Sequence, residues 1–177
     1  MRTVFVMTLL ASILAGSALA AEEMASRKVL GDRVEIMLPS HMGPMPKEMK
    51  NLKFPHLDER NSEVYGDYEG ECSFLFEYSN VGRRSDVSKL LATNLSEIKG
   101  SEVIEVLDSG LETINYRRYY FICSKSKAVD MYMYNYFRGT VLGEKVIHFS
   151  FSCPYKDRVK WAPIARQSLD SVKVLKR

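Results

Sequence analysis

The sequence predicts an α+β domain: an antiparallel sheet of about six strands with helices packed on its faces. Three observations predict this class. Alternating, aromatic segments follow one another from residue 103 to residue 153 with only hairpin-length gaps between them. An earlier hairpin pattern covers 63–78. Helix-like patterns at 86–98 and 157–170 supply helices to cover such a sheet.

The first twenty residues are typical of a secretory signal peptide. Arg2 is the only charged residue before Glu22, an apolar run covers 4–15, and small residues end the stretch at Ala18-Leu19-Ala20. The run is shorter than the roughly 20 apolar residues of a membrane span. A lipoprotein would need a cysteine directly after the run, and the first cysteine is Cys72. We therefore expect cleavage after Ala20, export to the periplasm or medium, and no membrane anchor afterwards.

The remaining residues, 21–177, are expected to form one globular domain with its own core. The formal net charge of the whole chain is +3, and the basic residues are scattered rather than gathered in a stripe. A nucleic-acid-binding surface needs a denser basic stripe, so nucleic acid is not an expected partner.

The first part of this domain is expected to begin irregularly over 21–32. Residues 33–38 alternate and predict a strand that Pro39 ends. The proline-rich connection over 39–62 has room for one short helix beginning at Pro46, where a missing amide costs nothing. Three apolar side chains near this helix are expected to face the core: Met45, Met49 and Leu52.

Residues 63–78 predict one strand or a hairpin, with the turn of the hairpin near Gly70. Apolar residues then recur at helical spacing over 86–98, which predicts an amphipathic helix. Ser85 is the expected N-cap, and Gly100 ends the helix.

Four strands are expected in the meander, with turns at 108–110, 125–127 and 138–143. The strands cover Val103–Leu107, Thr113–Cys123, Val129–Phe137 and Val146–Cys153. A closing helix over 157–170 contains Pro163, which must kink it or define its start. Residues 172–175 are a candidate edge strand.

This order of elements resembles the PsbP/DcrB-like superfamily. The likeness is clearest in Lys145–Pro154 followed by a helix ending at Leu169–Val174, and in the opening strand Val34–Pro39. The resemblance covers roughly residues 30–175 and implies a PsbP-like α/β/α sandwich. It also implies a non-catalytic, protein-binding role, because most members of the superfamily are not enzymes. No functional residue carries over, because no site motif of the family is matched.

The sequence lacks the usual signatures of catalysis and of metal binding. The histidines His41, His56 and His148 lie far apart, without the spacing of metal ligands, so no metal or cofactor is expected. No nucleophile elbow or phosphate-binding loop occurs after residue 20. Cys153 and His148 lie at an odd offset on one strand and therefore point to opposite faces. The sequence does not predict an enzyme.

The three cysteines permit at most one disulfide within the chain. Sequence alone leaves three pairings open. Cys123 with Cys153 is the first choice, because each lies at the end of a meander strand.

A run of tyrosines is the strongest candidate for partner binding. Tyr132, Tyr134 and Tyr136 share one face of a strand, and the preceding strand offers Tyr120 and Arg118. Tyrosine and arginine often anchor protein interfaces. Packing beneath a helix, with hydroxyls at the rim, is the alternative and is favoured because both faces of such a sheet are usually covered.

Export, the lack of catalytic signatures and the resemblance together predict a non-catalytic periplasmic domain that binds another protein. One specific version is an immunity protein that neutralises a secreted toxin. The alternative is a carrier of a small ligand or lipid, held in a cavity between sheet and helix.

Overall fold

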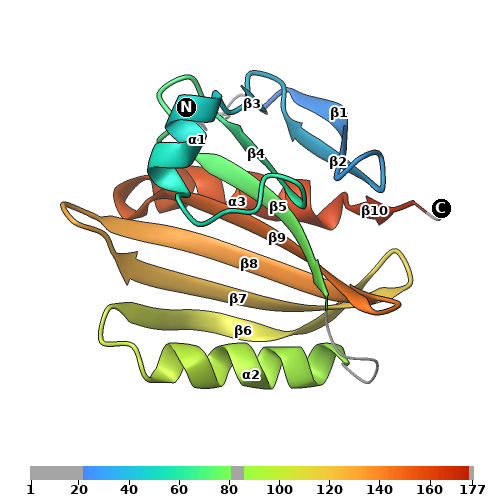
Figure 1. Ribbon diagram of the computed structural model, residues 1–177. Helices are drawn as coiled ribbons and strands as arrows, with labels where there is room; N and C mark the ends of the chain where they lie inside the picture. The colour runs from blue at the N-terminus through green and yellow to red at the C-terminus, as the bar shows by residue number, and fades with distance from the viewer. Residues whose placement is uncertain (1–21, 81–85, 176–177) are drawn as a thin grey trace, which may run out of the picture.

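The computed structural model describes residues 22–80 and 86–175, so the expected signal peptide lies outside the described residues. These residues form two antiparallel sheets and three α-helices (Figure 1). The smaller sheet has the order β1-β2-β10, with β1 Met24–Val29, β2 Val34–Pro39 and β10 Lys173–Val174. The order of the larger sheet is β3-β4-β5-β9-β8-β7-β6.

The strands of the larger sheet are β3 Gly43–Pro44, β4 Ser62–Gly66, β5 Ser73–Asn80, β6 Ile104–Ile114, β7 Arg117–Lys127, β8 Tyr132–Leu142 and β9 Lys145–Pro154. The helices are α1 Lys47–Lys53, α2 Val87–Lys99 and α3 Arg158–Asp170, and a 3₁₀ turn, Tyr155–Asp157, leads into α3.

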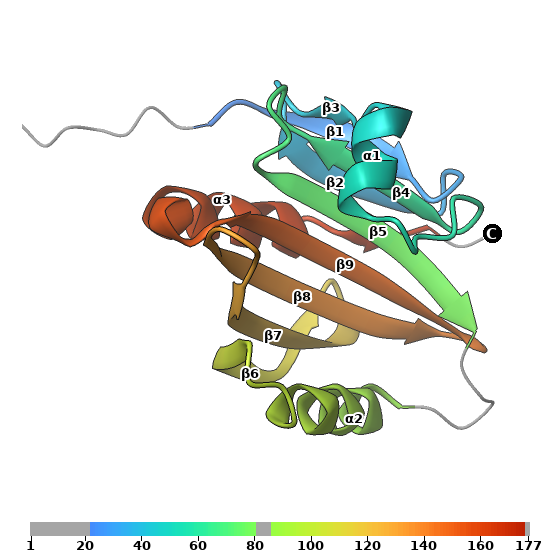
Figure 2. The ribbon, with the colours of Figure 1, turned by 60° about the vertical axis from the view of Figure 1, so that its left-hand side comes forward.

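Helices cover both faces of the larger sheet, as the sequence predicts. Helix α2 packs on β6, β7 and β8, whereas α3 packs on β8, β9 and the strand β2 of the smaller sheet. Figure 2 shows α2 and α3 on opposite sides of the sheet, with the β1–β2 hairpin beyond β5. The predicted antiparallel α/β/α arrangement is confirmed, with seven strands in the main sheet and a second sheet that was not expected.

The start of the domain is more ordered than the sequence suggests. Residues 24–29 were expected to be irregular, but they pair along their whole length with β2. Val29, at the end of this strand, is fully buried in the core. The polar composition of these residues does not predict a strand, because β1 buries only its end at Val29 and is otherwise held by its pairing with β2.

Strands run into all three turns predicted for the meander. Residues 108–110 continue β6, with a register shift between Val106 and Asp108, and the chain turns instead at Asn115 and Tyr116, both with positive φ. This is the backbone that two-residue hairpins require. Strand β8 likewise continues to Leu142, and the turn falls at Gly143 (φ +63°). The predicted loop at 125–127 is the end of β7.

Helix ends agree better with the sequence. Helix α1 begins after Pro46, and Met45 is buried there, but Leu52 is 83% exposed, so its predicted core position is wrong. The Asp86 carboxylate caps α2 by accepting from the Lys89 amide at 2.8 Å; the predicted cap, Ser85, lies outside the described residues. Gly100 ends α2 as predicted. Helix α3 passes through Pro163 and leads to β10, the expected edge strand.

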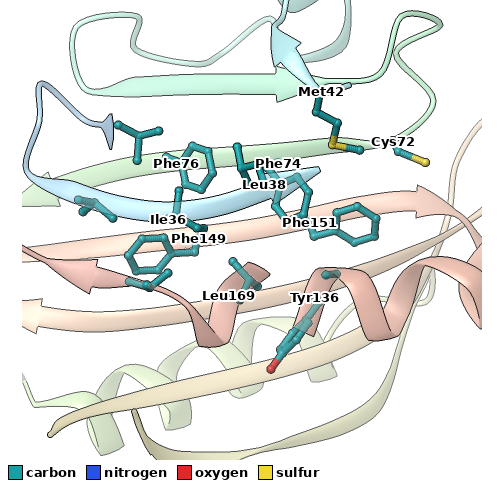
Figure 3. Packing of buried hydrophobic residues seen from close by; sticks show 14 of the residues in the cluster. Ile36, Leu38, Met42, Cys72, Phe74, Phe76, Tyr136, Phe149, Phe151 and Leu169 are labelled. Carbon is teal, nitrogen blue, oxygen red and sulfur yellow. The ribbon is translucent and has the colours of Figure 1, made fainter. Parts of the chain in front are cut away.

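The main core lies between the larger sheet, the smaller sheet and α3 (Figure 3). Four phenylalanines of β5 and β9 fill it: Phe74, Phe76, Phe149 and Phe151. The rings of Phe74 and Phe151 lie 4.8 Å apart, and Trp161 of α3 packs on Phe151. Such rings bury about 150–250 Å² each and dominate core energetics. A smaller cluster of Val87, Tyr120 and Ile122 fills the opposite face beneath α2.

Candidate functional surfaces

Two of the three predicted tyrosines of β8 are core residues. Tyr134 is 5% exposed and Tyr136 is 1% exposed, and both belong to the main core cluster. Their rings lie on the α3 side of the sheet, and burial raises the pKa of both hydroxyls. Tyr132, two residues closer to the β7–β8 hairpin loop than Tyr134, is 51% exposed. Only Tyr132 of this run is therefore accessible to a partner.

Tyr120 and Arg118 do not join the tyrosines of β8. Residues directly opposite across a strand pair share a face, and Tyr134 pairs with Lys125 while Tyr120 pairs with Gly139. Tyr120 therefore lies on the α2 face, with the odd-numbered residues of β8, and is buried there. Arg118 shares the face of Tyr120 and is exposed. The five predicted residues do not form one surface, because the strand register separates them.

An exposed aromatic surface remains around the β7–β8 hairpin. We call it the Tyr132 patch, and it consists of Lys125, Val129, Met131, Tyr132, Tyr155 and Lys156. A hollow of about 330 Å³ lies within it, lined by Met131, Tyr132, Pro154, Tyr155 and Lys156. Val129 and Met131 are exposed. The patch thus combines large apolar groups, a concave site and basic side chains.

A lysine holds the two tyrosines of the patch in place. The Lys125 Nζ lies 4.4 Å from the ring centroid of Tyr132 and 4.9 Å from that of Tyr155. The Arg158 guanidinium lies 5.4 Å from the Tyr155 centroid. Cation–π contacts of this kind contribute about 0.5–1 kcal/mol at exposed sites. The rings are therefore partly preordered, which lowers the entropy cost of binding.

Charges of both signs lie around the Tyr132 patch. Lys127 is paired with Tyr132 across the β7–β8 ladder, so it adds a further cation to those of the patch. Glu105 of β6 is paired with Lys125 across the β6–β7 ladder, which places a carboxylate on the same face. Asp130 lies in the hairpin loop and Asp157 before α3, near the basic residues Lys156 and Arg158. The rim of the patch is therefore mixed in charge.

A second candidate site lies in a narrow cleft between α2 and the sheet. The Tyr120 ring crosses over Gly139, and its hydroxyl lies 2.9 Å from the Nδ1 atom of His148. A Cβ atom at Gly139 would lie 2.4 Å from the Tyr120 ring, so only glycine permits this arrangement. The cleft holds about 170 Å³ and is lined by Asn94, Glu97, Ile98, Tyr120, Ile122, Phe137 and His148.

Burial shifts the titration of the groups in this cleft. It lowers the pKa of His148 and raises the pKa of Tyr120 to about 12. Glu77 of β5 lies opposite His148, and burial followed by the charge of Asp58 raises its pKa. A neutral His148 beside a protonated Tyr120 can offer hydrogen bonds to a small polar ligand. The volume is below the roughly 300 Å³ at which ligand pockets begin.

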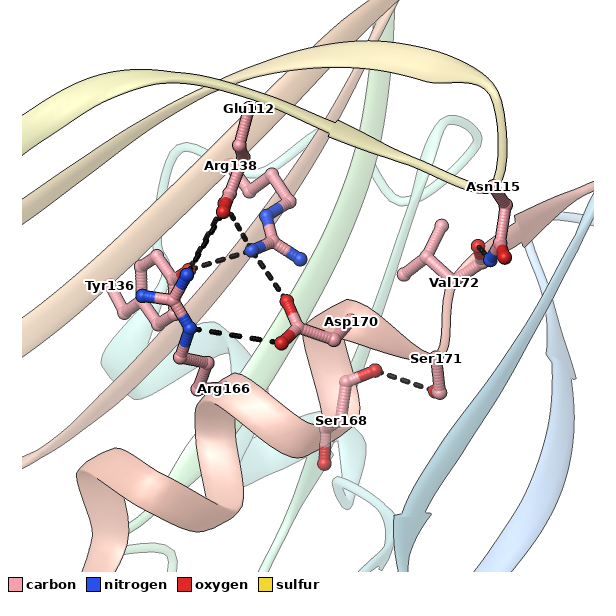
Figure 4. A network of polar contacts seen from close by, with 9 residues as sticks. All are labelled: Glu112, Asn115, Tyr136, Arg138, Arg166, Ser168, Asp170, Ser171 and Val172. Atoms are coloured by element: carbon pink, nitrogen blue, oxygen red, sulfur yellow. Dashed lines mark hydrogen bonds and ion pairs between the residues drawn. The ribbon is translucent and has the colours of Figure 1, made fainter.

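A buried ionic network ties α3 to the sheet on the opposite face (Figure 4). Arg138 of β8 is fully buried, and its Nη2 donates to the Tyr136 hydroxyl at 2.7 Å and to Asp170 at 2.8 Å. It also pairs with Glu112 of β6, which in turn accepts from Arg166 at 3.0 Å. The sequence placed Arg138 in a turn, where its burial could not be foreseen. Opposite charges are matched within the network, which favours a structural role.

The strand order separates Cys123 from Cys153, the pair that the sequence offered as a first choice for a disulfide. Cys123 lies on β7 and Cys153 on β9, with β8 between them. Two strand spacings of about 4.8 Å each put the two backbones farther apart than the roughly 7 Å between Cα atoms beyond which a disulfide needs backbone movement. Cys123 instead lies 3.6 Å from the Tyr134 hydroxyl.

Other kinds of site are not evident in the part of the chain that the structure describes. Within 22–80 and 86–175, no group of three or more His, Cys, Asp or Glu residues is arranged to hold a metal ion. Among the same residues, no helix has the length and apolar character to cross a bilayer.

The antiparallel sheet with α2 and α3 on opposite faces defines a PsbP-like fold. No family model and no curated protein sequence matches the chain. The solution structure of cyanobacterial PsbP from Synechocystis sp. PCC 6803 superposes with a TM-score of 0.61 and 11% identity, covering 89% of this chain and 95% of that protein.

Two further solved structures show the same fold. LpqN of Mycobacterium tuberculosis, described as involved in cell envelope biogenesis, has a TM-score of 0.59 and 11% identity, with 89% of this chain and 88% of LpqN covered. A protein from Bacteroides thetaiotaomicron has a TM-score of 0.57 and 14% identity, with 86% of this chain and 48% of that protein covered. At these identities the likeness establishes the fold and no more.

Proposed function

We propose that this chain is an exported, non-catalytic domain of the bacterial cell envelope that binds another protein through the Tyr132 patch. The observation that carries the proposal is the half-exposed Tyr132 ring and the partly buried Tyr155 ring, both held by Lys125 beside a hollow of about 330 Å³. Tyrosine and methionine are enriched in interface cores, and a concave apolar centre with a charged rim is typical of binding hot spots.

Two further observations support the envelope as the compartment. Residues 1–20 have the pattern of a cleaved signal peptide. LpqN, which shares the fold, is described as involved in cell envelope biogenesis. An immunity protein against a toxin delivered to the periplasm fits the same properties, since such a protein needs only a rigid, complementary surface.

A photo-cross-linking experiment in the producing cells tests the proposal. Replacing Tyr132 with 4-benzoylphenylalanine keeps an aromatic side chain at the patch and captures whatever lies against it. The matched control carries the same group at Tyr116, a fully exposed tyrosine in the β6–β7 turn at the other end of β7. We expect a discrete protein adduct at position 132 that is absent at position 116.

A second variant tests the chemistry of the partner. Lys125→Glu removes both cation–π contacts and reverses the charge, so the adduct at position 132 should fall at least tenfold. Truncating a true anchor usually costs about 2 kcal/mol or more of binding. Equal adducts at positions 132 and 116, or an adduct indifferent to Lys125→Glu in a folded protein, would contradict the proposal. Export has a separate test: N-terminal sequencing of the protein from the periplasmic fraction should give Ala21 as its first residue.

Carriage of a small ligand is the second candidate, and the cleft beneath α2 favours it. The apolar face of α2 is only partly buried: among its residues, Val87 is the one that is buried. A helix held this loosely can move outward and enlarge the cleft beside Tyr120 and His148. Titration with a fluorescent fatty acid tests this alternative. Saturable binding that Phe137→Trp weakens would support carriage, and no saturable signal would remove it.

A further inference from the structure

The two fully buried cysteines face each other across neighbouring strands. Ser73 of β5 pairs with Ser152 of β9, so continuing this antiparallel register by one residue sets Cys72, directly before β5, opposite Cys153. Cys72 is 3% exposed and Cys153 is 0% exposed, in the same core cluster. Figure 3 shows Cys72 beyond Phe74, next to Met42. Both side chains lie on the core face of the sheet.

The backbone at Cys72 brings the two residues close. Its amide donates to the Asp67 carboxylate at 3.1 Å, and its carbonyl accepts from the Asp67 amide at 3.2 Å. Both groups therefore point towards β4 and away from β9. Opposed residues that exchange no backbone hydrogen bonds have Cα atoms about 4.5 Å apart. Disulfides span about 4.4–6.8 Å between Cα atoms, so this pair can be bridged without moving the sheet.

We propose that Cys72 and Cys153 form a disulfide when the chain folds in an oxidising compartment, and that Cys123 remains a free thiol. The inference shares with the proposed function only the exported location. It needs no partner and does not depend on the Tyr132 patch. The bond would join the start of β5 to the end of β9, at the edge of the main core.

The bond has to form before the sheet closes. The contact with Cys153, followed by burial, raises the pKa of Cys72 in the folded chain, and the thiolate is the form that attacks. During folding, one thiolate attacks a sulfur atom of a disulfide-bearing oxidant to give a mixed disulfide, and the second thiolate displaces the oxidant's remaining sulfur. Two electrons pass from the cysteine sulfurs to the oxidant. The oxidant leaves as two thiols that carry the two protons.

Oxidative refolding of the purified chain tests the proposal. The protein is refolded from denaturant with oxidised and reduced glutathione, free thiols are blocked with iodoacetamide, and the digest is mapped by mass spectrometry. We expect the peptides of Cys72 and Cys153 to be linked and two hydrogens lighter than their sum, with Cys123 alkylated. Cys123→Ser should keep the linked pair, and Cys153→Ser should abolish it.

Thermal melting gives an independent readout. The bond closes a loop of about 80 residues, so oxidised wild-type protein should melt roughly 10 °C above the reduced form. Alkylation of all three cysteines after oxidative refolding would overturn the proposal, as would a bond to Cys123. Equal melting temperatures for the oxidised and reduced forms would do the same. Failure to capture a partner at position 132 leaves each of these outcomes unchanged, because the test uses only the purified chain.

Discussion

Tyr134 and Tyr132 lie on the same face of β8, two residues apart, and should respond very differently to truncation. Tyr134 is 5% exposed and packs in the main core, whereas Tyr132 is 51% exposed at the hairpin end. Replacing Tyr134 with alanine removes a ring that buries about 150–250 Å², worth roughly 4–6 kcal/mol at 25 cal/mol per Å². This area-based value is an upper bound, and measured changes of this kind cost about 3–5 kcal/mol.

The matched variants separate the ring from its hydroxyl. Tyr134→Phe loses only a contact of 3.6 Å with the Cys123 sulfur and should cost about 1 kcal/mol. Tyr132→Ala loses a half-exposed ring and the Lys125 contact, so we expect about 1–2 kcal/mol. Tyr134→Ala should therefore lower the melting temperature by roughly 10 °C, several times the effect of Tyr132→Ala.

Urea unfolding followed by circular dichroism measures these differences, provided that the m-value stays unchanged between variants. If Tyr134→Ala unfolds at the wild-type midpoint, Tyr134 is not a core residue and the assignment of the whole β8 face is wrong. If Tyr132→Ala is as destabilising as Tyr134→Ala, Tyr132 is needed for folding and is a poor candidate for partner contact.

Two further predictions concern the buried polar groups. Arg138→Ala should lower the unfolding free energy by about 3–5 kcal/mol, because the Glu112 and Asp170 carboxylates lose a buried cation. Arg166 is a half-exposed partner of the same carboxylates, so Arg166→Ala should cost under about 1 kcal/mol, and equal losses of the two variants in urea unfolding would refute the distinction. Burial lowers the pKa of His148 in the folded state, so the unfolded chain binds a proton at this residue at a higher pH than the folded chain does. The unfolding free energy should therefore fall as the pH drops from the ordinary histidine value of 6.5 towards the folded pKa, by at most about 1.4 kcal/mol per pH unit. His148→Gln should flatten this slope relative to wild type, and the Glu77 and Tyr120 side chains that face the same site are unchanged in this variant; an unchanged slope in His148→Gln would rule out His148 as the source.

The sequence predicted the elements whose signals are local. The strand at Val34–Pro39, the start of α1 after Pro46 and the end of α2 at Gly100 follow from proline, glycine and side-chain alternation within a few residues. The closing helix and its edge strand also agree with the structure. Turn positions in the meander did not follow, because polar residues at 108–110 are tolerated within the edge strand β6, none of whose residues is buried.

Which residues share a candidate surface depended on the pairing register between strands, which the sequence alone does not predict. Alternation along β8 correctly placed Tyr132, Tyr134 and Tyr136 on one face. Whether Tyr120 joined them depended on which residue of β7 lies opposite, and a one-residue shift exchanges the two faces of a strand. The Tyr120–His148 contact was equally hidden, because a ring of β7 reaches β9 only where Gly139 leaves a gap in β8.

The sequence by itself determined the fold class, the order of the principal elements and the expectation of export, since these rest on periodicity, turn residues and the first twenty positions. The tertiary structure decided which side chains meet. It buried two tyrosines beneath α3, left Tyr132 beside Lys125, separated Cys123 from Cys153 and set Cys72 against Cys153 instead. The physical reason is that a side chain's face is fixed by its own strand, whereas its neighbours are fixed by the hydrogen-bonded pairing of strands distant in the chain.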